Sequence, residues 1–339
     1  MNKLLKNKDK NFVVFFKCLS LYQLCNGASL VLMLKEKYGF SNLIPYFYYN
    51  PYWKNSLYER YKKKIEEIGI VFIEDEKKYC EIIQNHNKKY FISIKGSFDG
   101  FHLRGNFILI DDGIGSYRFN LLKLYRGYLR ERRAIGENIK TSFVRFCLRK
   151  SYARLSCRLF KPYHYGLFLE GGDKLNLNCE YIDSFNSFLD YLNNKPGANG
   201  YGNKIVIFMS QPSVRLGAIE GEEYLGFLKS LEKIVEKNGM SFLIKKHPGD
   251  NYDYSLFDCV EDECIAEELI YNLKEKIFGV ISFGSNSLIN ASILFGIKSY
   301  TIFRDNKPHQ YEKILYKIFN KYTYFVEYET IIRGEYFFV

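Results

Sequence analysis

The residue best suited to chemistry is His247, which follows a short apolar run and precedes a proline. The run at 242–244 predicts a strand buried on both faces of a parallel sheet, and Pro248 ends it. Ligands of such sheets bind at the carboxyl ends of strands, where Lys245, Lys246 and His247 are expected to lie. A histidine there can titrate or donate a hydrogen bond to a phosphate. An ordinary solvated strand end is the alternative interpretation.

A second strand end, after the run 106–110, carries the opposite charge. Asp111 and Asp112 follow this run directly, and Gly113 and Gly115 come next. Neighbouring carboxylates at a strand end diverge, so one can face a ligand while the other caps a helix, and glycine lets the backbone approach a ligand. A carboxylate beside an acceptor hydroxyl can serve as a general base. A simple turn followed by a helix cap would produce the same pattern.

A third stretch, at 281–291, predicts a strand that turns into a helix through small residues. The turn contains Gly284, Ser285, Asn286 and Ser287. The first amides of a helix have no partner within it, so they can bind a phosphate. A serine at this place also caps the helix, and capping does not exclude phosphate binding. These residues are therefore candidates for an anion site.

Strand and helix patterns alternate along the chain, which favours parallel sheets flanked by helices over a sandwich. At 339 residues the chain exceeds one hydrophobic core, so two domains are expected. The densest cluster of Gly, Asn and Pro, at 193–203, marks the boundary. We predict two doubly wound α/β domains, 1–195 and 204–323, and an aromatic segment at 324–339 that packs back on the first domain.

The apolar runs predict the individual elements. Strands are expected at 11–16, 42–48, 70–73, 90–94, 106–110, 163–170, 204–209, 241–246, 256–260, 277–282 and 299–303. Helices are expected at 29–35, 52–68, 181–192, 222–237, 265–274, 287–295 and 310–322.

Positive charge is concentrated in one segment. The chain has a formal net charge of +11, and the segment from Arg118 to Lys161 has the same excess, with thirteen basic residues and two acids. Apolar residues are interleaved with the basic ones, as in an amphipathic helix on an anionic membrane surface. A pair of solvated helices is one alternative. A nucleic-acid interface ranks lower, because no known binding module is recognisable.

The N-terminus and the cysteines bear on location. The apolar run at 12–16 is too short for a signal segment or a membrane span. The eight cysteines include no Cys-x-x-Cys pair. We therefore expect a cytoplasmic chain with reduced thiols, and a hydrophobic fraction of 47% indicates a globular protein.

Taken in order, the three motifs resemble those of the bacterial sialyltransferases that build capsules and lipooligosaccharides, including the polysialyltransferases. The matching residues are Asp111-Asp112-Gly113, His247-Pro248 and Ser285-Asn286-Ser287. Two weaker similarities are Leu21-Tyr22-Gln23-Leu24 and the helix start Ala266-Glu267-Glu268-Leu269. Asn286 departs from the pattern, since the family has a serine there, and this puts in doubt which hydroxyl contacts the phosphate.

The resemblance implies an inverting transferase with two Rossmann-like domains facing a cleft (GT-B type). It would move sialic acid, or a related nonulosonic acid, from a CMP donor to a glycan acceptor without a metal or other cofactor. Asp111 and Asp112 would supply the base and His247 would stabilise the phosphate. The implied donor contacts are Gly113, Lys246, Pro248, Glu267, Gly284, Ser285, Asn286 and Ser287.

Two other functions fit parts of the pattern. Enzymes that polymerise glycerol phosphate from a CDP donor also have a histidine before proline and a serine-rich helix start, although the Asp-Asp-Gly element argues against them. A non-catalytic basic protein that binds nucleic acid or an anionic polymer is the second. The identity of the catalytic base is also open, because Glu220, Glu222 and Glu223 follow Gln211-Pro212 in a loop that could face the same cleft.

Overall fold

The computed structural model describes residues 6, 8–49, 57–85, 91–96, 106–110, 144, 147, 163–169, 176–193, 204–260, 264–304 and 313–339. The chain forms two compact units that divide between residues 192 and 193, with the short stretch 55–57 assigned to the second unit. The division lies at the start of the Gly- and Asn-rich stretch where we placed the boundary.

The N-terminal unit is an α/β unit. Its strands are β1 (Phe12–Cys18), β2 (Leu43–Tyr49), β3 (Val71–Phe72), β4 (Phe91–Gly96), β5 (Asn106–Ile110) and β6 (Tyr163–Tyr165), followed by a small ribbon of β7 (Phe168–Leu169) and β8 (Asn176–Leu177). Its helices are α2 (Leu21–Glu36), α3 (Tyr58–Glu67), α4 (Glu76–Asn85) and α7 (Cys179–Leu192). The six main strands are all parallel and lie in the order β3-β2-β1-β4-β5-β6.

The C-terminal unit repeats this plan. Its strands are β9 (Ile205–Met209), β10 (Ser241–Lys245), β11 (Cys259–Val260), β12 (Ile277–Ser282), β13 (Ser299–Phe303) and β14 (Tyr324–Glu327). Its helices are α8 (Gly221–Lys237), α9 (Ala266–Leu273), α10 (Asn286–Phe295), α11 (Lys313–Tyr322) and α12 (Tyr328–Ile332). These strands are also all parallel, in the order β11-β10-β9-β12-β13-β14.

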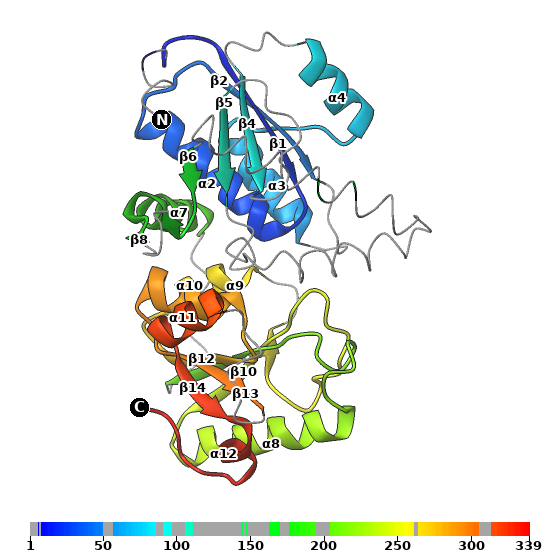
Figure 1. The fold of residues 1–339 in the computed structure, drawn as a ribbon, viewed down its shortest axis with the longest axis vertical. Coiled ribbons are helices and arrows are strands. Elements are labelled where there is room, and N and C mark those ends of the chain that lie inside the picture. The colour runs from blue at the N-terminus through cyan, green and yellow to red at the C-terminus, as the bar shows by residue number, and fades with distance from the viewer. Residues whose placement is uncertain are drawn as a thin grey trace. The chain divides into compact units, whose positions relative to one another are not determined.

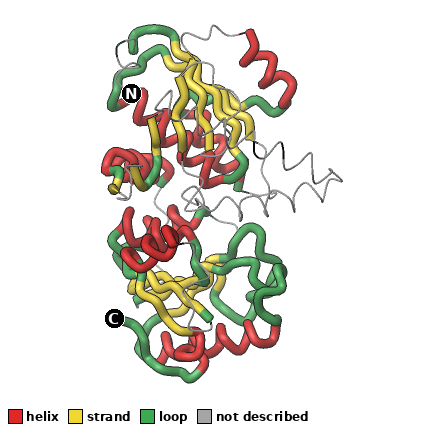
Figure 2. The backbone as a smooth tube through the Cα atoms, in the orientation of Figure 1, coloured by secondary structure: helices red, strands yellow, loops and turns green. Residues whose placement is uncertain are grey.

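Counted from the first strand of each unit, both sheets have the order 3-2-1-4-5-6, which is that of the Rossmann fold. In each unit the sheet lies as a layer between helices (Figures 1 and 2). The predicted fold class, two doubly wound α/β domains, is confirmed. The strand order reverses between β1 and β4 and again between β9 and β12, and ligands of such sheets bind at this point.

Alternate residues of β1 face the two helix layers of the N-terminal unit. The Phe15 ring meets the Tyr79 ring of α4 edge-on at 5.9 Å. Phe16 faces the other layer, where its ring lies against Gly27 of α2. Both phenylalanines are fully buried, as expected for a central strand covered on both faces.

Helix α2 is almost entirely enclosed, with 13 of its 16 residues buried, and it begins at Leu21 rather than at the predicted residue 29. Its start is set by a capping arrangement: Ser20 Oγ accepts the N–H of Gln23, and Gln23 Oε1 accepts the N–H of Leu19 at 2.7 Å. This local capping signal sets the start of the helix eight residues before the start that periodicity predicts.

Two buried polar residues of α2 face α7 and β6. Asn26 Oδ1 accepts the Tyr181 hydroxyl at 2.8 Å, and the Ser29 and Tyr165 hydroxyls lie 2.5 Å apart. A buried polar group is costly without a partner, so these contacts fix how α2 and α7 pack. Burial raises the pKa of the Tyr165 hydroxyl, which therefore stays protonated.

The last segment of the chain belongs to the C-terminal unit, so our prediction that 324–339 packs on the first domain is wrong. β14 extends the second sheet by pairing in parallel with β13. The Tyr328 ring of α12 stacks on Phe227 of α8 at 5.2 Å, and Lys298 Nζ donates to Val339 O at 2.5 Å. The aromatic residues of this segment fill the open edge of their own sheet.

Two further differences concern the predicted elements. The strand expected at 163–170 is divided into β6 and β7 at Gly166, because β7 leaves the main sheet and pairs antiparallel with β8. The strand expected at 256–260 is only the two residues of β11. Among the described residues, no helix is long and apolar enough to cross a membrane.

Replacing Gly27 by alanine is expected to destabilise the protein, because the new Cβ would lie 2.6 Å from the Phe16 ring and 3.1 Å from the Phe47 ring. Such overpacking costs about 1–3 kcal/mol. Gly226→Ala is the matched control, since that helical glycine has nothing within 4 Å of an added Cβ. There the change is expected to stabilise by about 1 kcal/mol through helix propensity. Urea unfolding of both variants measures the difference; a Gly27→Ala protein as stable as wild type would contradict this packing.

Candidate active site

The carboxyl ends of three neighbouring strands converge in the C-terminal unit. β9 pairs with β10 on one side and β12 on the other, so the loops that follow these strands lie next to one another. The loops begin with Ser210 after β9, Lys246 after β10 and Phe283 after β12. The position between β9 and β12 is the topological switch point of this sheet.

His247 lies at this edge, as predicted, in a tight turn just beyond β10. Its backbone N–H donates to Ser210 Oγ at 2.9 Å, and its carbonyl accepts the N–H of Asp250, also at 2.9 Å. The imidazole Nδ1 accepts the N–H of Gly249 at 2.9 Å. Pro248 is exposed at the corner of the turn, whereas Gly249 and Asp250 are buried.

The hydrogen bond at Nδ1 determines how this ring can act. A nitrogen that accepts an N–H carries no proton, so the proton of the neutral imidazole is on Nε2. Among the described residues, Nε2 has no hydrogen-bond partner. Burial lowers the pKa of His247, the charge of Asp250 opposes this shift, and the charge of Lys245 adds to it. The ring is therefore a neutral donor, Nε2–H, near pH 7.

Three buried side chains support the turn, and the sequence reasoning missed them. Asp250 accepts the Tyr254 hydroxyl at 2.6 Å and the Tyr252 N–H at 3.1 Å. The Tyr224 and Tyr254 hydroxyls lie 3.0 Å apart. Because Tyr254 gives its only proton to Asp250, Tyr224 must donate to the Tyr254 oxygen. An aspartate three residues after the histidine is the only local signal that could have indicated this network.

The two lysines before His247 face opposite sides of the sheet. Lys246 lies over the Tyr254 ring, on the side of α8, with its Nζ 5.9 Å from the ring centroid. Lys245 is buried, and its Nζ reaches Val260 O at 3.5 Å. Burial raises the pKa of Glu267 in α9, and the charge of Lys245 is one of the effects that oppose this rise. Alternation along a strand explains the difference. The predicted donor contact Lys246 thus lies on a different face from Lys245.

The turn after β12 has the expected form. Gly284 has φ of +74°, a left-handed conformation that favours glycine. Ser285 is the N-cap of α10, and its hydroxyl accepts the N–H of Ser287 at 3.3 Å. Asn286 is the first residue of the helix. Capping is therefore present, and the helix still directs the positive end of its dipole toward this edge.

Glu267, in the first turn of α9, is completely enclosed. Its Oε1 accepts the Asn290 side-chain amide of α10 at 2.6 Å. Burial raises the pKa of this carboxyl, and the bond from Asn290 and the charge of Lys245 oppose the increase. The pair ties the start of α9 to the middle of α10.

The three glutamates that we kept as alternative bases differ in their surroundings. Glu223 forms an ion pair with Arg304 and accepts the Tyr328 hydroxyl at 3.1 Å. Glu220 precedes α8 and does not cap it with its side chain, and Glu222 is exposed in the first turn. Glu223 is therefore held by structural contacts, whereas Glu220 and Glu222 have no such side-chain contact with the residues that the structure describes.

The predicted acidic motif lies outside the described residues. β5 ends at Ile110, directly before Asp111, Asp112 and Gly113. The basic segment from Arg118 to Lys161 also lies outside them, apart from Val144 and Cys147.

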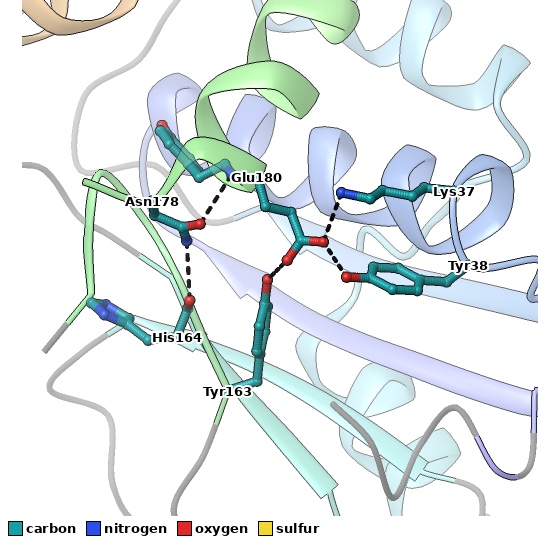
Figure 3. Close-up of polar contacts among 7 residues, drawn as sticks. Lys37, Tyr38, Tyr163, His164, Asn178 and Glu180 are labelled. Atoms are coloured by element: carbon teal, nitrogen blue, oxygen red, sulfur yellow. Dashed lines mark hydrogen bonds and ion pairs between the residues drawn. The ribbon is translucent and has the colours of Figure 1, made fainter. Parts of the chain in front are cut away.

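A polar cluster in the N-terminal unit is centred on Glu180 (Figure 3). Its carboxylate accepts the Tyr38 and Tyr163 hydroxyls and pairs with Lys37 Nζ at 2.9 Å. Burial raises the pKa of this carboxyl, but the hydrogen bonds and Lys37 outweigh burial, so the net pKa is below its usual value. Tyr163 begins β6 and Lys37 follows α2, so the cluster lies at the amino edge of its sheet. We assign it to packing, away from the edge where ligands bind.

Within the described ranges, no group of three His, Cys, Asp or Glu side chains could hold a metal ion. The groups at the carboxyl edge of the second sheet are instead a neutral imidazole, a helix start and a buried lysine. Such groups suit a ligand with negative charge.

The solved structures that resemble this chain include glycosyltransferases, a putative UDP-N-acetylglucosamine 2-epimerase from Listeria monocytogenes and a UDP-bound protein. The glycotransferase of kitacinnamycin has 8% identity and a TM-score of 0.51, covering 95% of this chain and 87% of its own. The S. aureus MnaA–UDP structure has 8% identity and a TM-score of 0.53, covering 95% and 86%. A sialyltransferase GT-B domain from Photobacterium damselae has 10% identity and a TM-score of 0.45, covering 93% and 100%. At these identities the likeness concerns the fold, which is of the GT-B type.

No curated protein sequence matches this chain significantly. The family model of the alpha-2,8-polysialyltransferases (POLYST) matches residues 49–304. This range runs from the end of β2 to the residue after β13 and includes all three motifs. The match covers most of the chain and confirms the resemblance to the bacterial sialyltransferases. The chain is a glycosyltransferase that belongs to the alpha-2,8-polysialyltransferase family.

Proposed function

We propose that this glycosyltransferase transfers sialic acid, or a related nonulosonic acid, from a CMP-activated donor to a glycan of the capsule or lipooligosaccharide, with inversion. The observation that carries the proposal is the state of His247, a neutral ring whose Nδ1 is occupied and whose Nε2–H is available. A CMP leaving group gains negative charge as the glycosidic bond breaks. A hydrogen-bond donor that is already in place at that edge, such as Nε2–H of His247, stabilises this charge without reorganisation.

The rest of the phosphate site consists of residues near the same edge. The start of α10, with Ser285 and Ser287, adds backbone dipoles, and Lys245 adds a buried positive charge. By the family resemblance, Glu267, which accepts the side-chain amide of Asn290, is proposed to bind a sugar hydroxyl of the nucleotide. With these groups supplying the stabilisation, we propose that transfer needs no divalent metal or other cofactor.

The base is proposed to be Asp111 or Asp112, which would deprotonate the attacking hydroxyl of the acceptor. Gly113 would let the backbone approach the substrate. Glu222 is the next candidate, because Glu223 is engaged by Arg304.

The basic segment is proposed to hold the enzyme at the cytoplasmic face of the inner membrane. Its excess of eleven positive charges between Arg118 and Lys161 equals that of the whole chain. Anionic lipids attract such a segment by about 1 kcal/mol for each basic side chain near the surface.

CMP is expected to stabilise the protein against heat, and CDP, UMP and UDP much less. At about 100 times its Kd, a ligand of the folded state adds about 2.7 kcal/mol to the free energy of unfolding. His247→Ala is expected to weaken CMP binding roughly 10- to 100-fold, the value of a hydrogen bond to a charged group. Differential scanning fluorimetry measures both effects. Equal stabilisation by CDP and CMP would favour a CDP-glycerol transferase instead.

Asp112→Asn, or Asp111→Asn if that carboxylate faces the substrate, is expected to lower the rate of transfer by about 10²–10⁴. CMP binding should stay nearly unchanged, because the partner of the base is the acceptor hydroxyl. Transfer from CMP-sialic acid, assayed in EDTA, measures the rate, and calorimetry measures CMP binding. Losses below roughly tenfold in both variants would remove this pair from the mechanism and move the assignment to Glu222. Full loss of wild-type activity in EDTA, restored by Mg²⁺, would contradict the metal-free proposal.

Reversing Arg130, Arg132 and Arg133 to Glu is expected to release the protein from anionic vesicles. Losing three attractions of about 1 kcal/mol each weakens binding by at least roughly 100-fold. The matched control reverses three exposed lysines of α8, Lys229, Lys233 and Lys237, which changes the net charge equally. Vesicle sedimentation compares the two proteins. Unchanged binding of the arginine variant, or equal release of both, would sink the membrane assignment of this segment.

A further inference from the structure

The loop after β9 is tied to the turn that carries His247. Ser210 is fully enclosed, and each of its polar backbone and side-chain atoms has a defined contact. Its N–H donates to Lys245 O at 3.0 Å, its carbonyl accepts Gln211 Nε2 at 2.8 Å, and its hydroxyl accepts the N–H of His247. This residue therefore has little freedom to move.

The hydroxyl of Ser210 replaces a backbone carbonyl as the acceptor of one hydrogen bond between the loop after β9 and the end of β10. The last backbone bond between β9 and β10 joins Ser210 N to Lys245 O, and the next N–H along β10 that points the same way is that of His247. It finds a side-chain oxygen of Ser210 instead of a backbone carbonyl. Because a buried N–H must be paired, this bond fixes where the turn begins.

The same contact belongs to a closed set of hydrogen bonds. Ser210 also bonds to the Tyr254 hydroxyl, whose pKa it lowers against the larger effect of burial. Tyr254 donates to Asp250, and the N–H of Asp250 donates back to the carbonyl of His247. A second side chain of the β9–α8 loop holds the turn from outside, since Arg215 Nη1 donates to Gly249 O at 3.0 Å.

We propose that Ser210 is a positioning residue for His247. Its hydroxyl accepts the backbone N–H of His247 and so fixes the turn at 247–250. In this turn Nδ1 accepts the N–H of Gly249, and the neutral ring therefore presents Nε2–H. The residue acts through His247 and needs no contact with substrate. The inference rests on the proposed function only for the identity of the anion that Nε2–H meets. The arrangement of the ring itself does not depend on it.

Nitrogen NMR of the five histidines in the full chain, labelled with ¹⁵N in the imidazole, tests this directly. The His247→Gln spectrum identifies the signals of His247. At a pH where the ring is neutral, wild type is expected to show protonated Nε2 and bare Nδ1. Ser210→Ala is expected to show a mixture of the two tautomers, whereas Ser210→Thr, which keeps the hydroxyl, should restore the wild-type pattern. The matched control is Ser213→Ala in the same loop, which should change nothing.

A titration with inorganic phosphate, followed on the same signals, gives the functional arm. Loss of one positioning hydrogen bond is expected to weaken phosphate binding about three- to tenfold in Ser210→Ala, and not in Ser210→Thr or Ser213→Ala. If Ser210→Ala does not fold, Ser210→Cys, a weaker acceptor, should show the same changes in smaller degree.

The outcomes separate the two claims. A Ser210→Ala protein (or, if that does not fold, a Ser210→Cys protein) with the wild-type tautomer at His247, or equal changes in Ser213→Ala, overturns the positioning role. A wild-type His247 whose signals do not respond to phosphate overturns the proposed anion contact, while the tautomer result still decides the role of Ser210.

Discussion

The C-terminal unit depends on the hydrogen-bonded ladder of β9. All five residues of this strand are buried, and its backbone pairs with β10 on one side and β12 on the other. Where the backbone hydrogen bonds between these strands end, side-chain hydroxyls pair with the next backbone groups. Ser282 Oγ donates to Met209 O at 2.6 Å, and Ser210 Oγ accepts the N–H of His247. A buried backbone group without a partner is costly, so the strands must end together. The three loops that carry polar groups therefore start from one edge.

Much of the fold could be predicted from periodicity and turn residues, and the strand order could not. Buried runs such as that of β9 mark strands whatever their neighbours, and Gly and Asn mark the loops between them. Pairing joins residues far apart, as when β12 takes its place beside β9 rather than beside β11. The segment 324–339 shows the same limit. Its aromatic character indicated that it is covered, but the surface that covers it is formed by strand β13 and helix α8 of its own unit.

The site divides in the same way. His247 and Ser285 lie two and three residues after the ends of β10 and β12, so their location could be inferred from the chain alone. Ser210 lies 37 residues before His247, and no local pattern relates the two. Lys245 and Lys246 differ because successive side chains along a strand point to opposite faces of the sheet. What each side chain contacts depends on the helix that packs on its face. The sequence thus shows that two lysines end this strand, but it does not show which of them contacts which part of the protein.

Both sheets also end in short strands. β3 and β11 have two residues each, β6 has three and β14 has four, whereas the inner strands have five to seven. An edge strand offers unpaired N–H and C=O groups on which another chain can build, and this template grows with its length. The short edge strands of these two sheets offer few unpaired N–H and C=O groups. A chain this rich in Tyr and Phe, with 30 and 29 of them, is thereby protected against joining its sheets edge to edge into aggregates.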